Sequence, residues 1–212
     1  MSKYSLKVVN LYKAFGRRLI FQDLNFNIEG NGVLGISGAN GSGKSTLIKI
    51  LAGINSSTSG SVIHADNGNE IPPEKLHNYI GFVSPYLVLY DEFSAWENLT
   101  YFAQIRGVKF NNEKIENLLN QFLLFDRRND LVKTYSSGMK QRLKFIFALM
   151  HSPQLVLLDE PTSNLDEEGK ESVYKIITDE SQSGIIIIAS NEKSDLSLCS
   201  KKIRLEDFKK IK

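Results

Sequence analysis

One stretch of nine residues constrains the fold of this chain more than any other part of the sequence. It fits the phosphate-binding loop pattern G-x-x-x-x-G-K-[ST], and its members are Gly38, Ala39, Asn40, Gly41, Ser42, Gly43, Lys44, Ser45 and Thr46. The apolar residues 33–36 before it predict a short buried strand. Apolar residues at helical spacing follow it (Leu47, Ile48, Ile50, Leu51). The sequence therefore predicts a strand, a glycine-rich turn and a helix, in this order.

A turn of this kind makes an anion site. Backbone N–H groups point into the loop, and the positive end of the helix dipole lies there. The glycines allow a close approach of backbone to phosphate and permit positive φ angles. We expect Lys44 to neutralise the β- and γ-phosphates of a nucleotide, and Ser45 to offer its hydroxyl to Mg²⁺. The alternative is a glycine-rich strand–helix turn that binds nothing.

Composition excludes several other classes of protein. The 212 residues suffice for one substantial domain, or for two small lobes that share a core. A net charge of +2 gives no electrostatic argument for nucleic acid, so we expect no nucleic-acid partner. The single cysteine, Cys199, cannot form a disulfide within the chain, which fits a reducing compartment. No apolar run approaches the ~20 residues that span a bilayer, so work at a membrane would require a partner subunit.

The order of predicted elements indicates an α/β core with a helical insertion. Strands are predicted at residues 4–9, 19–28, 61–65, 80–83, 155–158 and 185–189, with a weak one at 203–205. Residues 11–16 are expected to turn the chain beside Gly16. From about residue 94 to 150 the pattern is helical. Ser94 and Glu97 form a capping box, and further helices are expected at 113–125, 137–150 and 167–181. The basic residues 209–212 are expected to be solvated.

A second stretch supplies the other half of a metal and phosphate site. Residues 155–166 read Leu-Val-Leu-Leu-Asp-Glu-Pro-Thr-Ser-Asn-Leu-Asp. Four apolar residues place Asp159 at the C-terminal end of a buried strand, where α/β folds bind ligands and where it can hold Mg²⁺ next to Ser45. Glu160 is expected to point to the other side of the strand end, and could act as general base on the attacking water. The alternative is a solvent-facing acidic turn.

Residues 135–142, Tyr-Ser-Ser-Gly-Met-Lys-Gln-Arg, precede that strand. Ser136, Ser137 and Gly138 open a predicted helix, which makes a second anion site by the same physics. One chain offers one phosphate loop and one such site. Two chains arranged head to tail would hold each ATP between the phosphate loop of one chain and residues 136–138 of the other. Considered alone, these residues would indicate an ordinary capped helix.

Taken together, these residues resemble the ATP-binding cassette (ABC) family over essentially the whole chain. The resemblance implies one ABC ATPase domain over residues 1–212, with a P-loop NTPase core of mixed sheet, an N-terminal antiparallel β subdomain and a helical subdomain at about 86–150. It implies that Phe15 stacks on adenine, that 38–46 is the Walker A loop, that Asp159 ends Walker B, and that Glu160, aided by Lys44, is catalytic. Residues 163–166 would be the D-loop and 135–139 the signature. The form of residues 135–142 is similar to exporter-type cassettes, including the ATPase of the cytochrome c maturation haem exporter.

Three motifs depart from the family pattern, at four residues. The signature has Met139 in place of its final glutamine and Ser137 in place of a glycine. Pro85 stands where the glutamine of the Q-loop belongs, and proline has no side-chain donor or acceptor. Asn191 stands at the position of the switch histidine and can give the γ-phosphate only a neutral hydrogen bond, at a cost of ~1–2 kcal/mol, or roughly tenfold in rate. We therefore expect slow hydrolysis of ATP.

The resemblance implies a function and two alternatives to it. The leading interpretation is an ATP-hydrolysing subunit of an ABC membrane transporter, bound to the inner, cytoplasmic face of the membrane and paired with a second ABC ATPase chain, most simply a copy of itself. A helix of a polytopic membrane subunit would enter the groove near residues 85–92. The alternatives are an ABC-type ATPase that acts on a soluble protein or nucleic-acid partner, and a nucleotide-binding module that hydrolyses little.

Overall fold

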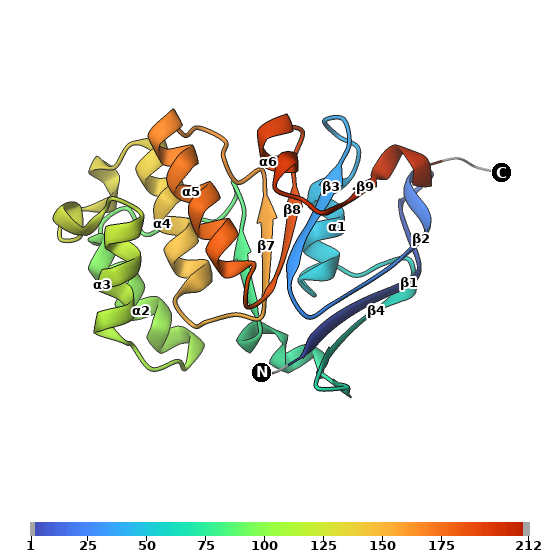
Figure 1. Cartoon of the computed structure of the whole chain (residues 1–212), viewed down its shortest axis with the longest axis horizontal. Coiled ribbons are helices and arrows are strands. Elements are labelled where there is room, and N and C mark those ends of the chain that lie inside the picture. Colours follow the sequence, from blue (N-terminus) through green and yellow to red (C-terminus); the bar gives the residue numbers. More distant parts are fainter. Residues whose placement is uncertain (1–2, 210–212) are drawn as a thin grey trace.

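Five parallel strands form the central sheet, in the order β6-β7-β8-β3-β9. Their bounds are Gly32–Ser37 for β3, Ile80–Val83 for β6, Leu155–Asp159 for β7, Ile185–Ala189 for β8 and Lys201–Arg204 for β9. The computed structural model describes residues 3–209, so most of the basic tail predicted at 209–212 lies outside the described residues. Figure 1 shows this sheet between a helical part of the molecule and a second, antiparallel sheet.

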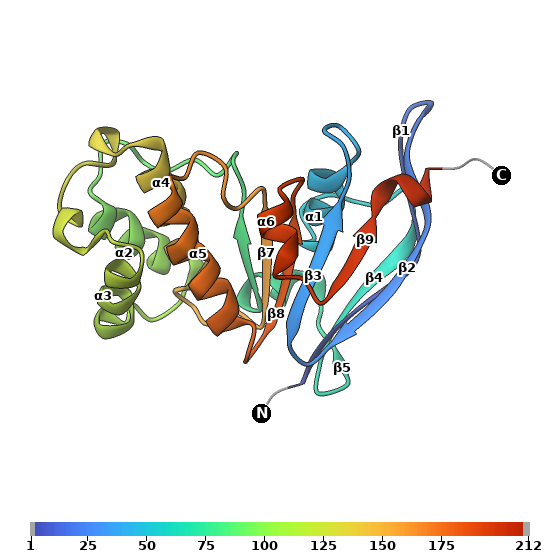
Figure 2. The same ribbon diagram turned by 45° about the horizontal axis from the view of Figure 1, so that its top comes forward.

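Alternate residues of the central strands enter two different hydrophobic cores. Leu155 and Leu157 of β7 belong to the core that contains α1 (Lys44–Leu51). Val156 and Leu158 belong to the other core, which contains α4 (Ser137–Leu149) and α5 (Glu167–Glu180). Figures 1 and 2 show α1 on one side of the parallel sheet and α4 with α5 on the other. Because both faces are covered, these strands are continuous apolar runs, as predicted.

The antiparallel sheet has the strand order β2-β1-β4-β5. Its bounds are Tyr4–Phe15 for β1, Arg18–Glu29 for β2, Ser59–Asp66 for β4 and Asn69–Glu70 for β5. The prediction that the first strand ends at residue 9 is wrong, since β1 continues to Phe15. The pairing with β2 shifts register after Val8, and Asn10 has a φ of 46°. These irregularities break the alternation that marks a strand, while Gly16 turns the chain as expected.

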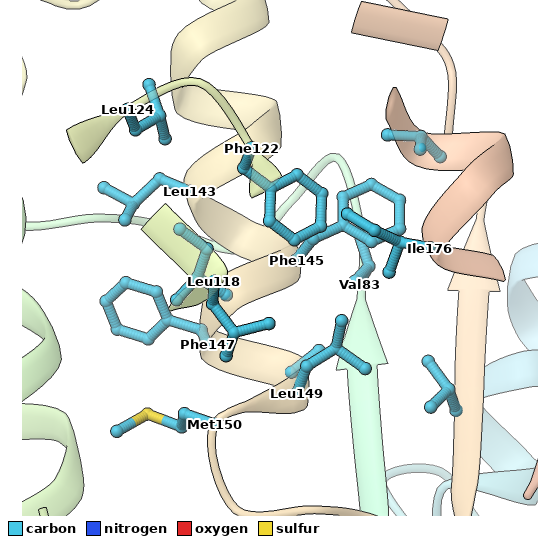
Figure 3. Close-up of a cluster of buried hydrophobic side chains, with 14 of the residues drawn as sticks. Val83, Leu118, Phe122, Leu124, Leu143, Phe145, Phe147, Leu149, Met150 and Ile176 are labelled. Atoms are coloured by element: carbon cyan, nitrogen blue, oxygen red, sulfur yellow. The ribbon is translucent and has the colours of Figure 1, made fainter. Parts of the chain in front are cut away.

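Three helices and the loops between them form the insertion. These are α2 (Ala95–Arg106), α3 (Asn112–Gln121) and α4. The capping box of Ser94 and Glu97 is confirmed, with both reciprocal hydrogen bonds formed. Figure 3 shows Phe122 after α3 meeting Phe145 of α4 and Ile176 of α5, and the two phenylalanine rings lie 5.5 Å apart between centroids. The insertion is thus joined to the core through α4.

The sequence did not predict α6 (Lys193–Ser197), which follows β8. A helix of five residues shows too little periodicity to be recognised from its apolar positions. It nevertheless buries the carboxylate of Asp195. Short 3-10 helices occur at Pro73–Asn78, Phe125–Arg127, Val132–Thr134 and Leu205–Phe208.

The α/β fold class with a mixed sheet arrangement and a helical insertion is confirmed. Among residues 3–209 there is no helix that combines the length and the apolar composition needed to cross a bilayer.

Candidate nucleotide-binding site

A cavity of about 470 Å³ opens at the C-terminal ends of β3 and β7. This volume lies within the range of about 300–1,000 Å³ that is usual for small-molecule sites. Its walls are Phe15, Arg18, Ile20, Asn40, Gly41, Ser42, Gly43, Lys44, Ser45, Thr46, Pro85, Tyr86, Asp159 and Glu160. The fold therefore brings most of the predicted phosphate loop together with both predicted carboxylates and with the aromatic Phe15.

The loop has the backbone that its sequence predicts. Gly41 and Gly43 have φ angles of 73° and 111°, in a region that side chains disfavour. A Cβ on Gly43 would also lie 2.3 Å from the Cγ2 atom of Ile20. The helix α1 starts immediately afterwards, so its free N–H groups face the cavity. The Oγ atom of Ser42 is buried and has no hydrogen-bond partner, as expected of a group that meets a ligand.

Lys44 is held at the centre of the site. Its Nζ atom donates to the carbonyl of Gly38 at 2.8 Å and to Oδ1 of Asn191 at 3.0 Å. It also forms an ion pair with Oε1 of Glu160 at 3.2 Å. Lys44 is buried, with 5% of its surface exposed, so its charge is poorly screened and acts strongly on groups in the cavity.

Ser45 and Asp159 meet as predicted. The hydroxyl of Ser45 donates to Oδ1 of Asp159 at 3.0 Å. The other oxygen, Oδ2, is buried without a partner. Burial raises the pKa of the Asp159 carboxyl, the Ser45 hydrogen bond opposes this shift, and the charge of Glu160 adds to it. A hydroxyl beside a buried carboxylate with a free oxygen suits a hard cation such as Mg²⁺, which takes its remaining ligands from phosphates and water.

Glu160 does not point away from Asp159, and the expectation drawn from strand alternation is wrong. Its φ is 50°, in the left-handed region, and its N–H donates to the carbonyl of Ala189 at 2.8 Å. The strand ends at Asp159, and this turn brings the next side chain back toward the phosphate loop. Both carboxylates therefore line one cavity. Glu160 also borders a smaller cavity of about 240 Å³ on the side of residues 162–165.

Two of the residues that depart from the family pattern, Pro85 and Asn191, lie at the site. Pro85 forms part of the cavity wall. Its carbonyl and that of Ser84 accept hydrogen bonds from Nζ of Lys144 on α4, at 2.9 and 3.3 Å. Asn191, besides contacting Lys44, donates from Nδ2 to Oδ1 of Asn40 at 2.6 Å. Asn191 thus joins the segment after β8 to the phosphate loop at two points.

Phe15 is 53% exposed at the mouth of the cavity, and Nζ of Lys13 lies 4.6 Å from the centre of its ring. The remaining predicted residues lie elsewhere. Gly38 and Ala39 are not on the cavity wall. Residues 136–138 begin α4 outside the cavity, where the hydroxyl of Ser136 accepts from the N–H of Met139.

Several residues at the site were not identified from the sequence, among them Arg18, Ile20 and Tyr86 of the cavity wall and Glu206. Arg18 lines the cavity and donates to the carbonyl of Gly41 at 3.3 Å; its nearness to Phe15 in the chain was the available signal. Glu206 accepts the N–H of Ala39 at 2.6 Å, and this hydrogen bond lowers the pKa of its carboxyl. No local pattern marks Glu206, because its partner lies far away in the sequence.

Comparison with known proteins identifies the family of the chain. The family model of ABC transporters matches residues 21–163. The chain is 39% identical over 186 residues to the lantibiotic transport ATP-binding protein SrtF of Streptococcus pyogenes. The aligned region covers 88% of this chain and 79% of that protein. It is 35% identical over 209 residues to the uncharacterized ABC transporter ATP-binding protein YhcH of Bacillus subtilis, covering 96% of this chain and 67% of that protein.

A solved structure shows the same fold. A Pyrococcus furiosus protein described as an ABC transporter ATP-binding protein superimposes with a TM-score of 0.83 at 26% identity, over 97% of this chain and 100% of that one. The family match covers more than half of the chain, and it spans the phosphate loop, the signature residues and the strand that ends in Asp159. This chain therefore belongs to the ABC transporter family, as an ATP-binding domain.

Proposed function

We propose that this chain binds ATP with Mg²⁺ and hydrolyses it slowly, as the ATPase subunit that drives a separate membrane subunit of a transporter. One observation carries the proposal. Lys44, Ser45, Asp159 and Glu160 converge on a single cavity of about 470 Å³, with the free N–H groups of a helix start at its base. This is the set of groups that phosphoryl transfer from a nucleotide needs.

The binding step uses the loop, the lysine and the aromatic ring. The N–H groups at the start of α1 and the charge of Lys44 would hold the β- and γ-phosphates of ATP. Ser45 and Asp159 would hold Mg²⁺, which supplies positive charge to the phosphates when bound. Phe15, exposed at the mouth of the cavity, would stack on the adenine ring.

Glu160 would act as the general base in the chemical step. Its carboxylate borders the cavity and would withdraw a proton from the attacking water. Lys44, 3.2 Å from Oε1 of Glu160 and buried, would stabilise the negative charge on the transferred phosphoryl group.

Two residues support a slow rate. Pro85 is on the cavity wall, and its ring offers no hydrogen bond to water or to the metal. Asn191 offers a neutral amide where a charged donor would serve better, a difference of ~1–2 kcal/mol or roughly tenfold in rate.

A second ABC ATPase chain, most simply a copy of this one, would complete the site. The residues at the start of α4 do not line the cavity of their own chain. A Cβ on Gly138 would lie 3.2 Å from the carbonyl of Asn164, so the signature and the D-loop adjoin each other at the surface. Ser136, Ser137 and Gly138 would reach the ATP that is bound to the partner chain.

A polytopic membrane subunit would bind beside the loop that follows β6. Six large apolar side chains on that loop and on or near α2 are exposed: Tyr86, Val88, Tyr90, Phe93, Tyr101 and Ile105. Phe93 joins two of them, with ring centroids 5.8 Å from Tyr90 and 5.2 Å from Tyr101. Such a patch fits an apolar helix of another chain. Bound to such a subunit, the chain would lie at the inner, cytoplasmic face of the membrane. The similarity to SrtF, named for lantibiotic transport, supports a role in transport.

The experiment is steady-state turnover of ATP with Mg²⁺ by the wild type, Glu160→Gln and, as control, Glu171→Gln, which changes an exposed glutamate of α5. We expect slow turnover in the wild type, a loss of about 10²-fold or more in Glu160→Gln with ATP binding retained, and no change in the control. Equal turnover in wild type and Glu160→Gln would overturn the role of Glu160.

The second candidate is a nucleotide-gated binding module, which Pro85 and Asn191 favour. Tight ATP binding without turnover in the wild type would establish it. The membrane partner is tested separately, by co-purification from detergent-solubilised membranes. Recovery of the chain from the soluble fraction alone would favour a soluble partner instead.

A further inference from the structure

Asp195 of α6 is a buried carboxylate close to the candidate site. Its exposed fraction is 1%. Oδ1 accepts the hydroxyls of Thr162 at 2.8 Å and Tyr174 at 2.9 Å, and Oδ2 accepts the hydroxyl of Ser190 at 2.6 Å. Within residues 3–209, Asp195 forms no ion pair. Three hydroxyls from three separate parts of the chain therefore stabilise its carboxylate. Burial of a carboxylate without a cationic partner lowers the free energy of unfolding.

Ser190 connects this carboxylate to Glu160. Ser190 has no exposed surface, and its Oγ atom accepts the N–H of Glu192 at 3.0 Å. The same Oγ lies 2.6 Å from Oδ2 of Asp195 and 3.4 Å from Oε2 of Glu160. A serine hydroxyl carries one proton and so can donate to only one of the two carboxylates at a time. The shorter distance assigns the proton to Asp195.

This arrangement connects Glu160 to the buried carboxylate through Ser190. The Oγ atom of Ser190 contacts Oε2 of Glu160, and its own position is fixed by Oδ2 of Asp195 and by the N–H of Glu192. The side chain of Glu160 therefore lies against a group that cannot move without breaking buried hydrogen bonds.

We propose that Ser190 and Asp195 are positioning residues for Glu160, which hold its carboxyl group in place beside Lys44 for the proposed attack of water. This inference rests on the proposed ATP hydrolysis. In that step, one O–H bond of water breaks and its proton passes to Glu160. The water oxygen bonds to the γ-phosphorus, the bond from that phosphorus to the β–γ bridging oxygen breaks, and its electron pair leaves with ADP. Glu160 then releases the proton to the phosphate product or to solvent.

Thr162 strengthens the positioning. It lies two residues after Glu160 and is buried, and its bond to Asp195 fixes the segment that turns Glu160 toward the cavity. Lys44 contacts Oε1 of Glu160 and Ser190 contacts Oε2, so the two oxygens are held from different sides. A role in folding alone would not require the hydroxyl of Ser190 to lie between two carboxylates.

The test compares kcat and KM for Mg²⁺-ATP in the full chain with ATP affinity measured by a fluorescent ATP analogue. We expect Ser190→Ala and Asp195→Asn each to lower kcat about tenfold, with KM and affinity changed less than about twofold. In Asp195→Asn, a neutral amide replaces the carboxylate that accepts three hydroxyls, so Ser190 and Thr162 are held less firmly. Ser190→Thr restores the hydroxyl and should recover most of the loss. Ser197→Ala removes an exposed hydroxyl from the same helix and should change nothing.

Rates are expressed per folded molecule, with the folded fraction taken from circular dichroism. The inference is overturned if Ser190→Ala and Asp195→Asn both have the kcat of the wild type per folded molecule. It is also overturned if the variants keep that kcat and show only weaker ATP binding, seen as a higher KM with a matching loss of affinity. If Ser190→Thr does not fold because its methyl group finds no space, the nearly isosteric Asp195→Asn decides the question. Failure of the proposed function is distinct, because the wild type and Glu160→Gln would then hydrolyse ATP equally or not at all.

Discussion

Asn191 binds the phosphate-loop lysine directly: its Oδ1 atom accepts a hydrogen bond from Nζ of Lys44 at 3.0 Å. The amide nitrogen of the same side chain donates to Asn40, at the start of the loop. One neutral side chain therefore links the end of β8 to two residues of the nucleotide site, where the ABC family pattern has a histidine.

This link predicts the effect of restoring the histidine. In Asn191→His, an imidazole can give the γ-phosphate a charge-assisted hydrogen bond, so kcat should rise by up to about tenfold. Asn191→Ala offers no donor and frees Lys44 and Asn40, so its kcat should fall below that of the wild type. Steady-state turnover of Mg²⁺-ATP measures both. A histidine variant no faster than the wild type would show that this position does not limit the rate.

Gly43 should be irreplaceable for nucleotide binding. In Gly43→Ala, the new Cβ would lie 2.3 Å from Cγ2 of Ile20 at a φ of 111°, so the loop or the Ile20 side chain at the cavity wall must move, and ATP affinity should fall more than about tenfold. Gly68→Ala is the matched control, because Gly68 also has a positive φ of 82° but has nothing within 4 Å of an added Cβ. We expect the control to lose about 1 kcal/mol of stability and to bind ATP normally. Fluorescence titration and chemical denaturation distinguish the two, and equal ATP affinities would contradict the assignment of the loop.

Burial of His64 should make the fold sensitive to acid. Its Nδ1 atom lies 2.6 Å from the hydroxyl of Tyr4, and burial lowers its pKa from 6.5 to about 4. Between these values the unfolded chain binds a proton that the native protein does not, so the free energy of unfolding falls as pH decreases from 6.5 to 4. The lost stability is ~3 kcal/mol at the lower end.

Chemical denaturation at pH 7.5, 5.5 and 4.5 measures this dependence. His64→Gln keeps an acceptor for Tyr4 and should lose less stability over this range than the wild type. His77→Gln changes an exposed histidine and should follow the wild type. If His64→Gln and the wild type show the same slope, burial of His64 does not cause the dependence.

Lys144 should restrain the loop that contains Pro85. It is buried and forms no ion pair with a carboxylate among residues 3–209. Burial lowers its pKa, and its Nζ atom donates to the carbonyls of Ser84 and Pro85. Lys144→Met removes both hydrogen bonds, so hydrogen exchange of the amides in residues 86–92 should quicken by about tenfold or more. Lys170→Met, which removes a partly exposed ion pair of α5, is the control and should leave that exchange unchanged. Unaltered exchange in Lys144→Met would mean that other contacts hold the loop.

Local physics made much of the fold and the site predictable. Spacing of glycines before a helix identified Gly41, Gly43 and Lys44, and the run of apolar residues before Asp159 placed that carboxylate at the end of a buried strand. The contact of Ser45 with Asp159 followed, because parallel strands bring their carboxyl ends to one edge of the sheet.

Other features depended on contacts that no local pattern records. The full length of β1 was not predicted because its bulges break strand alternation. The predicted direction of the Glu160 side chain was wrong because its backbone has a left-handed φ, with its N–H bonded to the carbonyl of Ala189. Glu206 meets Ala39 across 167 positions of the chain.

The sequence by itself determined which residues can bind a phosphate and a metal, since backbone freedom, charge and periodicity are properties of neighbouring residues. Only the tertiary structure decided which way Glu160 faces and that Ser190 and Asp195 stand behind it. The physical reason is that a side chain's direction at a strand end, and the partners of a buried carboxylate, are fixed by elements that fold against it from distant parts of the chain.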